Sequence, residues 1–147
     1  MALYFDTKLH LDHSVSVVSD IQWHNVAPVL AVAYFSEQSG GFVNVFNEEV
    51  SRPSMVSFQM FLLFCSYLQG EMEKAFLQKP VAVTALHWHP LRKYVAVGWE
   101  KGEVCVWNPQ EVLSEVGSSH HKHEITGVCW TSSGTRLLTA DRVGFLL

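Results

Sequence analysis

The chain contains three copies of one pattern, each anchored on a tryptophan, and this repetition constrains its fold more than any single motif does. The three anchors are Trp23, Trp88 and Trp130. A turn and an apolar run of strand length follow each anchor, and the runs end ten residues after it, at Ala33, Gly98 and Ala140. The spacing from Trp88 to Trp130 is 42 residues, within the roughly 40 to 45 residues of a four-stranded propeller blade.

The residues within each copy favour β-hairpins. Turn-forming residues follow the anchors in "HNVAP", "HPLRK" and "TSSGT". The next runs, "VLAVAY", "YVAVGW" and "RLLTAD", are nearly continuous in apolar residues, which is typical of a strand covered on both faces. Gly102 and Gly144 then supply the positive φ that a tight hairpin turn requires, and Trp107 closes the third strand of the second copy.

These hairpins resemble WD40 blades and predict an all-β fold, a partial WD40-like β-propeller with two to three four-stranded blades. The expected parts are an N-terminal strand segment (1–15), a first blade (16–50), an insert or linker (51–76), a second blade (77–119) and an incomplete third blade (120–147). The candidate for the fourth strand of the second blade is 111–119. Because a ring needs at least about four blades, we interpret the chain as the N-terminal part of a longer protein or as a truncated product.

The interval from Trp23 to Trp88 is 65 residues, longer than the next one. The additional residues include the charge-free run 55–68, which is shorter than the roughly 20 residues of a membrane-spanning helix. The insert is expected to be helical or disordered, and three interpretations are open: an unusual insertion between blades, a helix that binds a partner or a membrane surface, and sequence foreign to the fold. The last is favoured because an exposed insert should be polar.

Composition narrows the class of protein. The net charge of -4 and the absence of a basic run argue against a nucleic-acid-binding surface. Cys65, Cys105 and Cys129 are at unrelated spacings, which fits free thiols in a reducing compartment. The N-terminal residues lack the pattern of a secretory signal, and no transmembrane segment is expected.

The histidines are the obvious metal candidates. His87 and His89 share one face of an expected strand, and "HHKHE" adds three more imidazoles. His24 and His89, however, occupy the same repeat position, where the third copy has Thr131. A structural role in the turn is therefore favoured, and neither a metal nor another cofactor is expected.

No catalytic residue is predicted. The sequence has neither a G-x-S-x-G nucleophile elbow nor a phosphate-binding glycine loop, and no local pattern places a partner beside Cys105 or Cys129. The expected structural positions of the blades are Trp23, Trp88, Trp130, Gly102, Gly144 and Trp107.

The candidate protein-contact turn is Trp99 with Glu100 and Lys101. Trp99 is the leading residue of this turn because the other copies have Tyr34 and Asp141 at its position. Residues that recur in all three copies are expected to pack the blades, whereas a residue without an equivalent is the better candidate for a contact surface.

WD40 blades often contain a His, Ser/Thr, Asp and Trp hydrogen-bond network, with the Asp just before the turn glycine. Here that position is Lys101 in the second copy and Val143 in the third, while Asp141 comes two positions earlier. His123 is the histidine at a suitable distance before Trp130. Whether the network forms is left open by these departures.

Longer stretches resemble a particular family. "MALYFD", "LAVAYFSEQSGGFVNVF", "LHWHPLRKYVAVGWEKGEVCVWN" and "HEITGVCWTSSGTRLLTADRVGFLL" together are similar to the first blades of the large WD40 and TPR subunit of the intraflagellar transport A complex. The resemblance covers 1–6, 19–47 and 71–147; at about 50–70 that family has only a short polar connection.

The resemblance implies a non-enzymatic scaffold that assembles with other intraflagellar transport A subunits. It also implies retrograde transport with a dynein motor, cilium assembly and entry of membrane proteins into cilia. The expected location is the cilium, at the axoneme and ciliary base, and the cytoplasm. The alternative is a propeller scaffold of a vesicle coat or of another protein-interaction complex.

Overall fold

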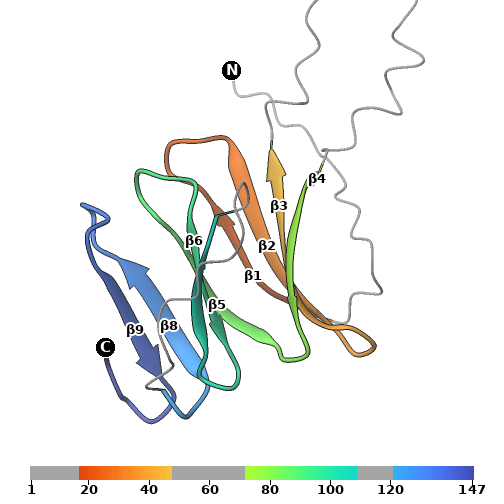
Figure 1. The fold of residues 1–147 in the computed structure, drawn as a ribbon, viewed down its shortest axis with the longest axis vertical. Helices are drawn as coiled ribbons and strands as arrows, with labels where there is room; N and C mark the ends of the chain where they lie inside the picture. Colours follow the sequence, from red (N-terminus) through yellow and green to blue (C-terminus); the bar gives the residue numbers. More distant parts are fainter. Residues whose placement is uncertain (1–16, 48–71, 109–120) are drawn as a thin grey trace, which may run out of the picture.

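The computed structural model describes residues 17–47, 72–108 and 121–147, which form nine strands in three antiparallel sheets (Figure 1). The first sheet has the order β1 (Val17–Trp23), β2 (Val29–Ser36), β3 (Gly40–Asn47) and β4 (Met72–Lys79). The second contains β5 (Val83–Trp88), β6 (Val95–Trp99) and β7 (Val104–Trp107). The third contains β8 (Ile125–Trp130) and β9 (Leu137–Asp141), beside an isolated bridge from Ala140 to Leu146.

The sheets stack face to face in chain order, and apolar side chains fill the spaces between them (Figure 1). The largest buried cluster joins the first and second sheets and includes Val29, Ala31, Val43, Val45, Leu86, Trp88, Val97 and Trp107. A smaller cluster joins the second and third sheets and includes Ala85, Ala96, Val106, Ile125 and Val128. The prediction of an all-β, partial propeller is therefore confirmed, and the described ranges contain no helix.

The first two strands of every sheet share an irregularity. Their register shifts at Ser19, Thr84 and Thr126, which hold the same position in the three copies. A β-bulge of this kind bends the strand and increases its twist. In the second sheet the Thr84 hydroxyl donates a hydrogen bond to the Gly98 carbonyl at 3.2 Å. The repeats therefore share backbone geometry as well as residue pattern.

β4 corrects the expected blade boundaries. It pairs along β3 from Gly41 opposite Lys79 to Phe46 opposite Met72, so 72–79 is the outer strand of the first sheet. The expected end of the first blade at 50, and the assignment of these residues to the insert (51–76) and second blade (77–119), are therefore wrong. The additional residues lie between two strands of one blade rather than between blades.

Two expectations fall on residues that the structure does not describe. The charge-free run 55–68 lies outside the described residues. The pairing of β4 with β3 rules out an insertion between blades, while the partner- or membrane-binding helix and the sequence foreign to the fold remain predictions. The candidate fourth strand at 111–119 also lies outside them.

The tryptophans that were expected to pack in blade cores differ in their burial. Trp88 and Trp107 are buried and Trp130 is partly buried, whereas Trp23 is 56% exposed. The difference follows from the stacking order, because Trp88 packs against the blade before it and no sheet precedes β1 in the described part of the chain. The expectation that Trp23 packs in a blade core is therefore wrong for this structure.

The glycines of the outer hairpin turns adopt positive φ. Gly102 and Gly144 have φ values of 88° and 87°, and each donates its N–H to the carbonyl three residues earlier. In the first copy Gly40, rather than the neighbouring Gly41, has this conformation, with φ of 92°. A side chain in this region would be strained.

Two histidines connect neighbouring blades. In the first blade, Nδ1 of His24 accepts the N–H groups of Val26 and Ala27 at 3.1 and 3.0 Å. The ring proton must therefore be on Nε2, which donates to the Arg92 carbonyl of the next blade at 3.0 Å. The edge of the same ring packs on Trp88, with ring centroids 5.3 Å apart.

His89 repeats this arrangement one blade later. Its Nδ1 accepts the N–H groups of Leu91 and Arg92 at 3.1 and 3.0 Å, and its Nε2 donates to the Gly134 carbonyl at 3.1 Å. Gly134 has a φ of 70°, and the His89 ring occupies the space that a Cβ would need there. We call these two contacts the histidine links.

The His89→Ala variant tests the second histidine link. Removing the ring leaves two N–H groups and one carbonyl without their partner, so the free energy of unfolding should fall by about 2 kcal/mol. The matched control is His123→Ala, because His123 is exposed and its loss should cost less than about 0.5 kcal/mol. Urea unfolding followed by circular dichroism measures both, and equal losses would contradict a special role for His89.

Candidate interaction site

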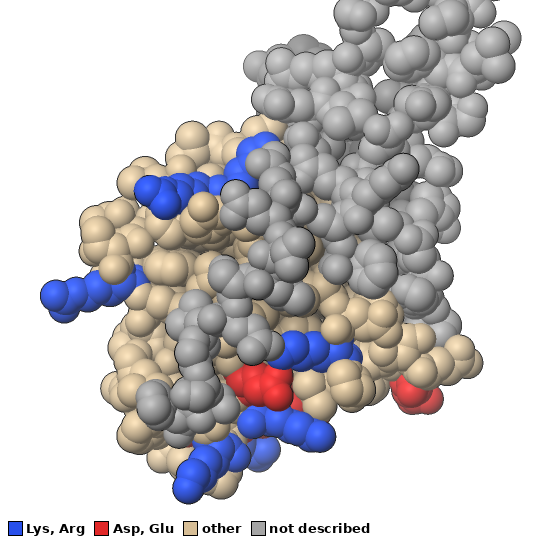
Figure 2. All heavy atoms as spheres, in the orientation of Figure 1, with Lys and Arg blue, Asp and Glu red and all other residues tan. Residues whose placement is uncertain are grey.

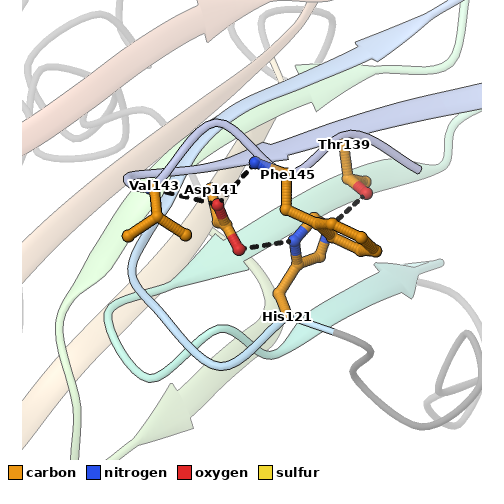
Figure 3. Close-up of polar contacts among 5 residues, drawn as sticks. All are labelled: His121, Thr139, Asp141, Val143 and Phe145. Carbon is orange, nitrogen blue, oxygen red and sulfur yellow. Dashed lines mark hydrogen bonds and ion pairs between the residues drawn. The ribbon is translucent and has the colours of Figure 1, made fainter.

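A buried polar network lies in the third blade, beside the turn that follows β9. Nδ1 of His121 is 3.1 Å from Oδ2 of Asp141, and its Nε2 is 2.8 Å from the Thr139 hydroxyl (Figure 3). All three side chains are nearly inaccessible to solvent. The second oxygen of Asp141 accepts the N–H groups of Val143 and Phe145 at 3.1 and 2.9 Å. The network therefore fastens the turn to the strand.

The charge state of Asp141 follows from these contacts. Burial alone raises the pKa of its carboxyl group, but the hydrogen bonds from the Phe145 N–H, the His121 ring and the Val143 N–H outweigh burial. The pKa consequently lies below its ordinary value of 3.8. Because the ionised carboxylate can only accept, Nδ1 of His121 donates to it, and in the neutral imidazole Nε2 accepts the Thr139 hydroxyl proton.

This network corrects the sequence-based assignment of the histidine. The partner is His121, while His123 is exposed and makes no contact with Asp141. Asp141 reaches the histidine from the end of β9 rather than from the position before Gly144. The signal in the sequence was the pair Thr139 and Asp141, since residues two apart on a strand share one face.

The second blade fills the equivalent positions with different chemistry. Trp99 and Glu103 correspond to Asp141 and Phe145, because the N–H of the first residue of each pair donates to the carbonyl of the second. Lys79 corresponds to His121, because each lies three residues before the carbonyl, of Ala82 or Glu124, that accepts the next N–H of the turn. The Trp99 ring is buried, its Nε1 lies 3.5 Å from the Cys105 sulfur, and Nζ of Lys79 lies 5.4 Å from the ring centroid. Lys79 also forms an ion pair with Glu103.

The candidate contact turn is therefore only partly available to a partner. The expectation that Trp99 forms a contact surface is wrong, because its exposed fraction is 0% and its ring fills the position of the third-blade carboxylate. Glu100 and Lys101 are exposed at the tip of the turn. They remain the candidate contact residues, held by the hydrogen bond from the Glu100 N–H to the Ala82 carbonyl at 3.0 Å.

The contacts of the buried polar network run from a carboxylate through an imidazole to a hydroxyl group, as in a hydrolase triad, but all three side chains are buried. Thr139 is 7% exposed and its hydroxyl is used by His121, so a substrate carbonyl has no route to it.

Among the residues described, no group of three or more His, Cys, Asp and Glu side chains could hold a metal ion. No helix in the same ranges is long and apolar enough to cross a membrane.

Three stacked antiparallel sheets, with a buried His, Thr and Asp network in the third blade, define a segment of a WD40-type β-propeller. A family model described as the IFT140 first beta-propeller matches residues 2–147. The chain therefore belongs to the family of IFT140 first propellers.

Other known proteins share parts of this structure. Periodic tryptophan protein 2 homolog of Caenorhabditis elegans is 32% identical over 62 residues, which are 42% of this chain and 7% of that protein. A chain in the crystal structure of the mitotic checkpoint complex aligns with a TM-score of 0.57 and 16% identity, over 83% of this chain and 31% of that one. This similarity shows the fold alone.

A computationally designed protein, Ika4, aligns over 98% of this chain and 97% of its own, with 10% identity. Its TM-score of 0.44 is too low to indicate a shared fold. The chain thus spans only a small part of the curated relative and about a third of the mitotic checkpoint chain.

Asp141→Asn tests the charge of the network. A lowered folded pKa means that the carboxylate stabilises the chain above pH 3.8 and that this contribution is lost as pH falls through the folded pKa. The variant should therefore be less stable than the original chain at pH 7, and the difference should shrink below pH 3.8. Thermal unfolding across this pH range measures the effect, with Glu100→Gln as the exposed control.

A tryptophan pair tests the inward position of Trp99. Trp99→Ala should lower the free energy of unfolding by roughly 3 to 5 kcal/mol because it empties a buried site, whereas Trp23→Ala should cost less than about 1 kcal/mol. Trp99→Phe keeps an aromatic ring and should recover much of the loss. Urea unfolding followed by circular dichroism compares the variants, and equal effects of the two alanine substitutions would refute the assignment.

Proposed function

We propose that the chain is a non-enzymatic interaction module of the intraflagellar transport A complex. The observation that carries this proposal is the match of the IFT140 first propeller over residues 2–147. The stacked sheets support it because they place hairpin turns of successive blades beside one another, and such rows of turns are suited to binding proteins.

The partners that we propose are other subunits of the same complex. Through them the module takes part in retrograde transport with a dynein motor, in cilium assembly and in the entry of membrane cargo into cilia. Its proposed location is the cilium, at the axoneme and ciliary base, together with the cytoplasm. The buried, fully engaged His121, Thr139 and Asp141 set supports a structural role over catalysis.

We propose Glu100 and Lys101 as contact residues within this function. Both are exposed, and the backbone beneath them is fixed by the hydrogen bonds from Trp99 N–H to Glu103 and from Gly102 N–H to Trp99, each 3.0 Å. A turn held in this way loses little conformational freedom when a partner binds.

Co-purification of the tagged chain from ciliated cells tests the function and the contact turn together. The unmodified chain should recover intraflagellar transport A subunits, and the Glu100→Ala/Lys101→Ala variant should recover several-fold less because it removes rim contacts. Ser19→Ala, an exposed substitution on β1 outside both rows of turns, is the control. Recovery of vesicle-coat subunits without ciliary transport subunits would contradict the proposal.

A further inference from the structure

A second surface is formed by the turns that connect the first and second strands of each blade. We call it the first-hairpin rim, and its residues are 24–28, 89–94 and 131–136. The three turns lie in a row at the upper left of Figure 1, at the opposite end of the sheets from the Glu100 turn. The histidine links of His24 and His89 join each turn to the next, so the rim is one connected surface.

The charges on this rim have one sign. Its charged residues are Arg92, Lys93 and Arg136, and the three turns contain no Asp or Glu, although the whole chain has a net charge of -4. The turns at the other end of the sheets carry both signs, as at Glu100 and Lys101. Figure 2 shows the same contrast on the face in view: the coloured charged side chains in the upper part are all Lys or Arg, whereas basic and acidic side chains lie together in the lower part.

Exposed apolar side chains lie between these charges. Val26 is 77% exposed and Leu91 is 69% exposed, and each is the third residue after the anchor tryptophan of its blade. Turn tips are ordinarily polar, so two apolar tips on neighbouring turns are unusual. Beside them the Arg92 guanidinium lies 6.0 Å from the centroid of the Tyr94 ring, which supports it.

We infer that the first-hairpin rim binds an acidic protein segment that carries apolar side chains. The acidic groups would pair with the basic residues, and the apolar side chains would cover Val26 and Leu91. An anionic membrane is the weaker fit, because lipid-binding clusters contain about four to eight Lys or Arg residues and this rim has the three named above. The linked turns are already ordered, which lowers the entropic cost of binding.

Titration of a short fluorescent peptide tests this inference with the full chain. The peptide has Asp and Glu interspersed with Leu and Phe, and fluorescence anisotropy reports its binding. The Arg92→Glu/Arg136→Glu variant should bind at least about tenfold more weakly, since each reversal turns attraction into repulsion. Binding should also weaken as salt is raised. Lys122→Glu, a matched reversal at an exposed residue outside the first-hairpin rim, should leave the affinity unchanged.

A second variant separates the apolar part of the surface from the charged part. Val26→Ser/Leu91→Ser keeps every charge and should weaken binding several-fold through the lost apolar contact. Circular dichroism and thermal unfolding check that all variants remain folded, since Arg92→Glu removes the contact with the Tyr94 ring.

Three results would overturn the inference. They are the absence of saturable peptide binding, an equal loss in the Lys122→Glu control, and tighter binding to phosphatidylserine vesicles than to the peptide. None of them depends on intraflagellar transport subunits or on the Glu100 turn. The inference and the proposed function can therefore fail separately.

Discussion

The hydrogen bond from a histidine of one blade to the hairpin turn of the next is the interaction on which the alignment of these sheets depends. Apolar burial between sheets supplies most of the attraction, but it has no direction and would permit neighbouring sheets to slide. His24 and His89 remove that freedom, because two backbone N–H groups fix each ring and its remaining nitrogen can reach only one carbonyl. The same contact then places the rows of turns that form the two rims.

The repeat made much of this fold predictable. Hairpins anchored on Trp88 and Trp130 and the positive-φ turns at Gly102 and Gly144 follow from local residue types that recur at fixed spacing. β4 was missed because an outer strand needs no continuous apolar run, and "MEKAFLQK" contains three charged residues. Its place in the first sheet is fixed by pairing with β3, which local sequence does not encode.

The site was harder to predict than the fold, for a related reason. Trp99 differs from its counterparts Tyr34 and Asp141, and that difference suggested exposure, yet all three side chains point inward. The relevant information was the position in the blade, not the residue type. His121 could not be chosen over His123 because the choice depends on how the segment before β8 meets the end of β9. Such contacts between strands depend on register, which single residues do not specify.

Two different sets of side chains occupy the same position in the second and third blades, and this limits which single substitutions the sequence can accept. In the third blade an imidazole, a carboxylate and a phenyl ring fit together, and in the second an ammonium group, an indole and a carboxylate do so. Introducing Asp alone at 99 would empty the space of a fully buried indole ring, and introducing Lys alone at 121 would remove the acceptor for the Thr139 hydroxyl. Each single exchange is unfavourable although the complete exchange is not, so substitutions at these positions should be strongly epistatic.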